Sequence, residues 1–93
     1  MPSMGPVAVM WYTLTAEQGN AEAQHGLCLM YQNGLGVPRD YVYAYMWAQF
    51  SAQNGHEDGI RLRDYLEARM TRFEIQRAEK LARECVKKNY KNC

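Results

Sequence analysis

The sequence has no apolar run of the roughly 20 residues that a transmembrane helix needs. Residues 1–10 carry no Lys or Arg ahead of their apolar stretch, so they make a poor secretory signal. We therefore expect no membrane contact, and the cytoplasm is the default location. A periplasmic or secreted location stays open if the N-terminus is truncated, because upstream residues could carry a signal.

Cysteine is scarce, and none of the three residues, Cys28, Cys85 and Cys93, belongs to a CxxC pair. This number and spacing do not indicate a disulfide framework. Cys85 and Cys93 could form a bridge, but residues 89–93 resemble a fraying tail, so we expect Cys93 to be free. Buried free thiols in a reducing compartment are the favoured interpretation.

Only two histidines are present, and neither belongs to a short paired spacing such as HxxxH. A metal site is therefore not expected, although Glu57 and Asp58 follow His56. His25 lies three residues before Cys28, a spacing at which a base and a nucleophile could meet on a helix. We expect Cys28 to pack between helices instead, and so predict no enzymatic activity and no cofactor.

Basic residues are nearly absent from residues 1–56, which hold one basic and three acidic side chains. Eight of the eleven aromatic residues lie in this part, whereas residues 57–93 hold ten basic and seven acidic side chains. The basic residues are interleaved with glutamates and form no unbroken positive face. Nucleic-acid binding is therefore not expected.

No segment alternates polar and apolar residues with the period of a half-buried strand. Asn20, Asp40 and Thr71 each precede a segment with helical spacing and are expected to cap a helix. Thr71 and Glu74 also form a capping box, with Met70 and Ile75 beside it as a hydrophobic staple. We expect an all-α chain of antiparallel helix hairpins, with helices at about 20–31, 41–53, 56–69 and 71–90.

Residues 8–19 and 44–55 repeat each other at a distance of 36 residues, with both tryptophans, Trp11 and Trp47, in register. A fixed period of roughly 20–50 residues indicates a stacked repeat array. Such arrays usually offer an extended surface to a partner. The register also predicts that both tryptophans are structural. The identical pairs are Ala8/Ala44, Met10/Met46, Trp11/Trp47, Ala16/Ala52 and Gly19/Gly55.

The repeat organises residues 1–93 as one helical-repeat domain. Its expected parts are the second helix of an incomplete repeat at 7–18, a complete repeat at 19–54, a degenerate half repeat at 55–70 and a capping helix at 71–90. The incomplete repeat lacks its own first helix, which leaves an apolar flank without a neighbour. The residues expected on this flank are Val9, Met10, Trp11 and Leu14.

The complete repeat has glycines, a tyrosine and a tryptophan at fixed positions. The positions concerned are Gly19-Asn20-Ala21-Glu22-Ala23-Gln24, Leu27, Met30-Tyr31, Asn33-Gly34, Gly36-Val37, Asp40, Ala44, Trp47 and Ala52. This pattern resembles the Sel-1-like repeat, a family of tetratricopeptide-type helical solenoids. The resemblance covers about residues 7–70. It implies an α/α superhelix, a right-handed solenoid of about one and a half to two repeats with a C-terminal capping helix. Cys28 stands where the family pattern usually has glycine, and Gly59 where it has alanine.

Members of this family are mostly adaptors that hold protein partners in a groove lined by the first helix of each pair. The resemblance therefore implies a non-enzymatic protein–protein interaction module that binds a peptide or protein. If Ala23, Leu27 and Tyr31 face the second helix, the opposite face of the first helix lines this groove. The expected partner-binding residues are Glu22, His25, Leu29, Gln32, Asp58, Arg61 and Tyr65.

Two alternatives remain for the uncovered N-terminal helix. It could pair with a second copy of the chain, which would make the protein a structural homo-oligomer, most simply a homodimer. The chain could also be a fragment of a longer repeat protein, in which another repeat covers this helix.

Overall fold

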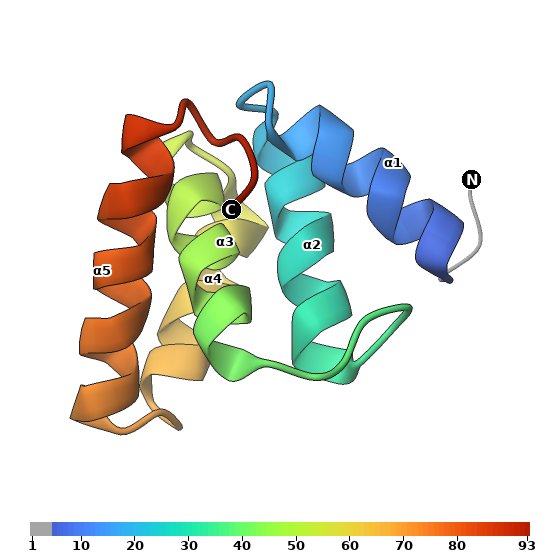
Figure 1. Ribbon diagram of the computed structural model, residues 1–93. Helices are drawn as coiled ribbons and strands as arrows, with labels where there is room; N and C mark the ends of the chain where they lie inside the picture. Colours follow the sequence, from blue (N-terminus) through green and yellow to red (C-terminus); the bar gives the residue numbers. More distant parts are fainter. Residues whose placement is uncertain (1–4) are drawn as a thin grey trace.

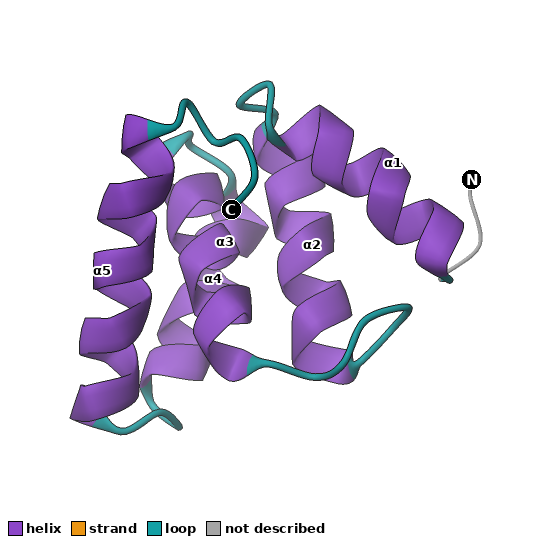
Figure 2. Ribbon diagram, in the orientation of Figure 1, coloured by secondary structure: helices purple, strands orange, loops and turns teal. Residues whose placement is uncertain are grey.

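The computed structural model describes residues 5–93, so part of the segment assessed as a signal, residues 1–4, lies outside the described residues. Helices alone make up the regular structure of residues 5–93, as Figure 2 shows, and this confirms the expected all-α fold. None of these helices is long and apolar enough to cross a membrane. They are α1 (Pro6–Ala16), α2 (Ala21–Asn33), α3 (Tyr41–Gln53), α4 (Glu57–Glu67) and α5 (Arg72–Lys87).

Helix α3 is the centre of the fold. It packs against α2, α4 and α5, whereas α1 packs mainly against α2 (Figure 1). Helices α1 and α5 therefore form the two outer edges of the molecule. Eight of the thirteen residues of α3 are buried, among them Met46, Trp47 and Phe50. The apolar, charge-poor part of the sequence thus supplies most of the core.

The helices begin where the capping residues predict. The side chain of Asn20 accepts a hydrogen bond from the backbone N–H of Ala23 at 2.8 Å, and Asp40 accepts one from Tyr43 at 3.1 Å. The capping box at the start of α5 is formed as well. These caps satisfy N–H groups that have no partner inside the helix, so they fix the start of each helix locally.

The start of α4 has a cap that the sequence did not indicate. His56 precedes the helix, and its Nδ1 accepts a hydrogen bond from the backbone N–H of Gly59 at 3.1 Å. The imidazole must be unprotonated at Nδ1 to accept this bond. Histidine therefore takes the place of the usual Ser, Thr, Asp or Asn here.

The two tryptophans of the repeat differ in their environment. Trp47 is 3% exposed, whereas Trp11 is 51% exposed. The prediction that both are structural is therefore wrong for Trp11, because no described helix covers this face of α1. The exposure of Trp11, together with that of Met10 and Leu14, confirms the prediction of an uncovered flank on this helix. Val9, which was expected on the same flank, is instead partly buried against the core.

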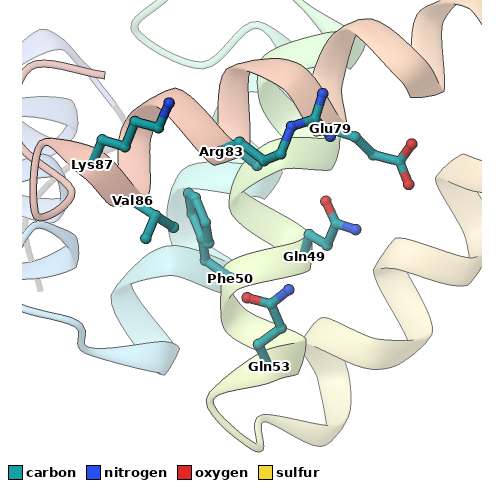
Figure 3. A pocket seen from close by; sticks show the side chains of 8 residues that line it. Gln49, Phe50, Gln53, Glu79, Arg83, Val86 and Lys87 are labelled. Atoms are coloured by element: carbon teal, nitrogen blue, oxygen red, sulfur yellow. The ribbon is translucent and has the colours of Figure 1, made fainter.

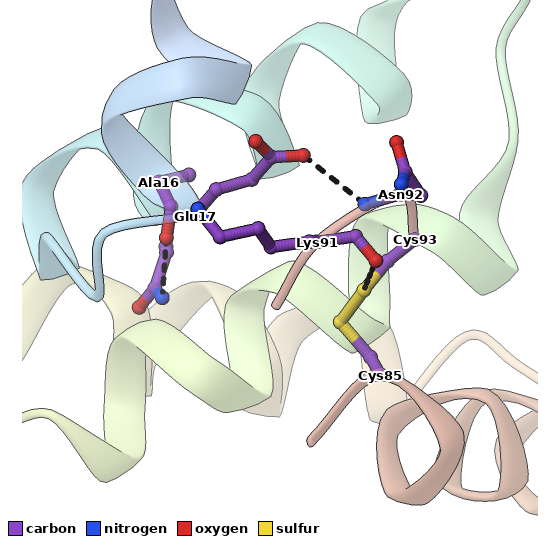
Figure 4. Close-up of a disulfide and its surroundings, with 7 residues drawn as sticks. Ala16, Glu17, Cys85, Lys91, Asn92 and Cys93 are labelled. Carbon is purple, nitrogen blue, oxygen red and sulfur yellow. Dashed lines mark hydrogen bonds between the residues drawn. A yellow bond between two sulfur atoms is a disulfide. The ribbon is translucent and has the colours of Figure 1, made fainter. Parts of the chain in front are cut away.

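The C-terminal tail folds back onto the helices instead of fraying. After α5, Asn89, Tyr90 and Asn92 adopt positive φ angles, which turn the chain back on itself. A disulfide then joins Cys85 to Cys93 (Figure 4). The prediction of a free Cys93 is wrong, because these turns bring the two cysteine Cα atoms within 5.4 Å of each other.

The tail is also held by contacts outside the disulfide. The backbone N–H of Asn92 donates a hydrogen bond to Oε2 of Glu17 at 3.2 Å, which Figure 4 shows as a dashed line. The ring of Tyr90 packs edge-to-face on Phe50. The tail therefore connects the end of α5 to the turn between α1 and α2 and to the last turn of α3.

Candidate functional site

The residues predicted to line a groove lie on the outward faces of α2 and α4, which contact each other beside α3. A shallow, open depression of about 340 Å³ lies between these faces. We call it the α2–α4 groove. Five of the seven predicted residues line it together with Leu62: His25, Leu29, Asp58, Arg61 and Tyr65.

The other two predicted residues, Glu22 and Gln32, do not line this depression. Leu62 was missed, although it follows Asp58 by four residues and therefore shares its face of the helix. The periodicity of the two helices thus brings five predicted residues together. Their part in binding stays a prediction.

Arg61 is held on the rim of the α2–α4 groove by its own helix. Its guanidinium forms an ion pair with Oδ1 of Asp58 at 2.6 Å and a longer one with Glu57 at 3.8 Å. All three side chains are largely exposed to solvent. Exposed pairs of this kind contribute only about 0–1 kcal/mol to stability. Arg61 can therefore exchange these contacts for a partner's carboxylate at little cost.

Two imidazoles stack at one end of the groove. The rings of His25 and His56 lie 4.9 Å apart, centroid to centroid, with 29° between their planes. Burial lowers the pKa of His25, and the neighbouring His56 lowers it further, while Asp58 and Glu22 act in the opposite direction. His25 therefore favours the neutral form near pH 7.

The Sel1 repeat family model matches residues 6–20 and 21–56, together more than half of the chain. The chain belongs to the Sel1 repeat family. The resemblance noted in the sequence is thereby confirmed, and with it the helical-repeat solenoid. Proteins built from these repeats are generally protein-interaction modules.

Two similar proteins show how this Sel1 repeat chain compares in length. The chitin synthase regulator SKT5 of Malassezia restricta is 34% identical over 55 residues, which are 59% of this chain and 4% of that protein. A protective antigen present in uropathogenic Escherichia coli strains, which displays an SLR fold, has a crystal structure that matches with a TM-score of 0.79 and 32% identity. The match covers 88% of this chain and 19% of the antigen. The chain thus spans a small part of either protein.

Buried polar contacts set the position of the repeat helices relative to one another. Gln24 is fully buried, its amide group donates to the carbonyl of Ala16 at 3.2 Å, and its oxygen accepts from Asn54 at 3.0 Å. The hydroxyl of Ser51 donates to the carbonyl of Ala21 at 2.8 Å. Because buried polar groups are costly when unpaired, these bonds favour one arrangement of α1, α2 and α3. The periodicity of single helices gives no signal for such contacts.

The two departures from the family pattern have different surroundings. Cys28 is fully buried between helices of the Sel1 repeat. Gly59 lies where α4 crosses α3 closely, and a Cβ atom there would lie 2.8 Å from Cβ of Ser51. The glycine therefore permits a helix approach that an alanine would obstruct.

The chemistry of Cys28 does not suit a nucleophile. Burial raises the pKa of its thiol to about 12, so it is protonated at neutral pH, whereas a reactive cysteine needs the thiolate. His25 and Cys28 therefore do not form the pair of base and activated nucleophile that their spacing suggested. Within residues 5–93, no three His, Cys, Asp or Glu side chains lie close enough together to hold a metal ion.

Proposed function

We propose that this Sel1 repeat chain is a non-enzymatic interaction module that binds a peptide or protein in the α2–α4 groove. The observation that carries the proposal is the convergence of five predicted residues, from two different repeats, on one open depression. Its family supports the same general role, since Sel1 repeat proteins are generally interaction modules.

The groove offers chemistry that suits a partially polar segment. Leu29 and Leu62 provide apolar surface, and Arg61 and Asp58 provide exposed charges. The guanidinium of Arg69 lies 3.6 Å from the ring centroid of Tyr65 and orders this half-exposed ring. Tyrosine and arginine are residues that often dominate binding energy at interfaces. A short peptide or a charged helix is the kind of partner that this surface fits.

Affinity capture from a lysate of the source organism tests this proposal. The chain is compared with Arg61→Glu and with a matched control, Arg77→Glu, which makes the same charge change on α5 outside the groove. We expect a protein that is retained by the chain and the control but lost with Arg61→Glu. Circular dichroism verifies that all three are folded. A partner that Arg61→Glu still retains would place binding elsewhere.

A second candidate function, assembly through α1, has a specific observation in its favour. Met10, Trp11 and Leu14 are exposed, whereas the residues 36 positions later, Met46, Trp47 and Phe50, are buried. Equivalent positions of the repeat are thus buried in one copy of the repeat and exposed in the other. A second copy could cover this face, as could the first helix of a preceding repeat in a longer protein.

Multi-angle light scattering tests self-assembly over a wide range of concentration. A mass that rises toward the dimer, and falls again with Trp11→Glu, would support pairing through α1. A chain that stays strictly monomeric at high concentration would remove this candidate.

A further inference from the structure

A second cavity lies between α3 and α5, on a different pair of helices from the α2–α4 groove. It has a volume of about 540 Å³ and shares no residue with that groove. Figure 3 shows the side chains that surround it. We call it the α3–α5 cleft. Its lining residues are Gln49, Phe50 and Gln53 of α3 and Glu79, Ala82, Arg83, Val86 and Lys87 of α5.

The cleft combines an apolar strip with polar side chains on both of its helices. Phe50 and Ala82 are buried, and Val86 leaves about half of its side chain exposed at the edge. Gln49 and Gln53 stand one helical turn apart on α3, and Arg83 and Lys87 stand one turn apart on α5. Amide groups from α3 and cationic groups from α5 therefore lie on opposite sides of the cleft.

Several of these polar groups have no partner within residues 5–93. The Oε1 atom of Gln49 is buried and accepts no hydrogen bond. Glu79, Arg83 and Lys87 take part in none of the ion pairs of the described chain, although Glu79 and Arg83 have the helical spacing for one. A buried acceptor without a donor is costly and uncommon in folded proteins. A ligand N–H group would satisfy it once the Gln49 side chain turns toward the open cleft, because the atom is buried in its present position.

The charged groups of the cleft all lie on α5. Glu79, Arg83 and Lys87 follow one another at steps of one helical turn and give the cleft one carboxylate and two cations. A ligand carboxylate would pair with the cations, and Arg83 can hold it with two hydrogen bonds. A nucleic-acid strand fits poorly, because Glu79 would repel its phosphates and two cations form no continuous basic face.

We propose that the α3–α5 cleft binds an extended peptide segment that carries an acidic side chain next to an apolar one. The peptide backbone supplies N–H groups to Gln49 and Gln53, the acidic side chain pairs with Arg83 and Lys87, and the apolar side chain covers the strip. The volume lies within the range of about 300–1,000 Å³ that is usual for ligand sites. The proposal is independent of the α2–α4 groove, and a chain with both sites holds two partners at once.

Selection of random octapeptides displayed on phage, with the whole chain as bait, tests this proposal. Enriched peptides are then synthesised, and their affinity is measured by fluorescence anisotropy. We expect Asp or Glu beside an apolar residue in the enriched peptides. Arg83→Glu should weaken binding by about tenfold or more, as expected for reversal of a paired charge. Arg77→Glu, on α5 outside the cleft, and Arg61→Glu, in the α2–α4 groove, should change it by less than about twofold.

A peptide in which Asn replaces the acidic residue separates the ion pair from general charge effects. It should bind the original chain as weakly as the acidic peptide binds Arg83→Gln, and Arg83→Gln should cause no further loss with it. Arg83→Gln also serves in place of Arg83→Glu if circular dichroism finds that the latter is unfolded. The proposal is overturned if no peptide is enriched, if the enriched peptides show no acidic preference, or if Arg61→Glu abolishes binding while Arg83→Glu does not.

Discussion

The ring of Tyr90, in the C-terminal tail, packs edge-to-face on Phe50 in the last turn of α3, with 4.9 Å between the ring centroids. Phe50 in turn packs on Trp47, with 5.6 Å between centroids. The tail is therefore part of the aromatic core, although the sequence there resembles a disordered end.

Replacing Tyr90 with alanine should destabilise the fold by about 1–3 kcal/mol, because it removes an aromatic pair and opens one side of Phe50 to water. The free energy of unfolding in urea measures this effect. Phe73→Ala is the control: this ring is 78% exposed, so its loss should cost about 0.5 kcal/mol or less. Equal effects of the two changes would mean that the tail does not pack on α3 in solution.

Opening the Cys85–Cys93 disulfide should lower stability by about 2–3 kcal/mol, the magnitude that chain entropy gives for a short loop. Thermal unfolding with and without a reductant measures the difference. In Cys93→Ser the reductant should have no effect, since Cys28 is a free thiol. The bridge persists only where the surroundings are oxidising, so the same chain would be less stable in a reducing cytoplasm.

Stability should fall as the solution is acidified, because of His25. Its pKa is lowered in the folded state, mainly by burial and next by His56, from the usual value of 6.5. Below pH 6.5 the unfolded chain therefore binds a proton that the folded chain does not, so this contribution to stability is lost as the pH falls from 6.5 to the folded-state pKa. Urea unfolding midpoints at a series of pH values measure the slope. His25→Asn should flatten it, and an unchanged slope would show that other groups cause it.

Gly59→Ala should destabilise the chain by about 1–3 kcal/mol, because the added Cβ overlaps the side chain of Ser51 and forces α3 and α4 apart. The family pattern usually has alanine here, so the loss would come from the closer approach of α4 in this chain. Glu57→Ala, a change on an exposed side chain in the first turn of α4, is the control. Chemical denaturation that finds both variants equally stable would contradict the close approach.

Replacement by alanine should lower the stability of the fold by different amounts at the two tryptophans. Trp47→Ala should cost about 3–5 kcal/mol, as for a fully buried aromatic residue, whereas Trp11→Ala should cost less than about 1.5 kcal/mol. Fluorescence of the two single-tryptophan variants gives a second measurement, since buried Trp47 should emit at shorter wavelength than Trp11. Similar emission from both would show that α1 is covered in solution.

The sequence allowed prediction of features that depend on neighbours along the chain. Asn20, Asp40 and Thr71 mark helix starts because each caps a backbone N–H group only three residues away. The five residues that line the α2–α4 groove follow from helical periodicity carried through one repeat.

Features that depend on distant neighbours were not predictable in this way. The identity of Trp11 with Trp47 in the repeat was misleading about burial, because burial depends on which helix lies beside α1; the missing first helix, in contrast, did predict an exposed flank that includes Trp11. Formation of the disulfide depends on the turns that follow α5 and on the packing of Tyr90 against Phe50. The bond from Gln24 to the carbonyl of Ala16 joins groups from two repeats, and no local pattern marks it.

The position of Gln24 has a consequence for the shape of a longer array. Its side chain holds the end of α1 and the turn after α3 at one point, so this point acts as a pivot between successive repeats. Helix α1 has 11 residues and extends away from it. At 1.5 Å per residue, a rotation of about 10° at the pivot would move the far end of α1 by about 3 Å. A change in the contacts of this buried amide would therefore alter the angle between neighbouring repeats, and with it the curvature of a longer array.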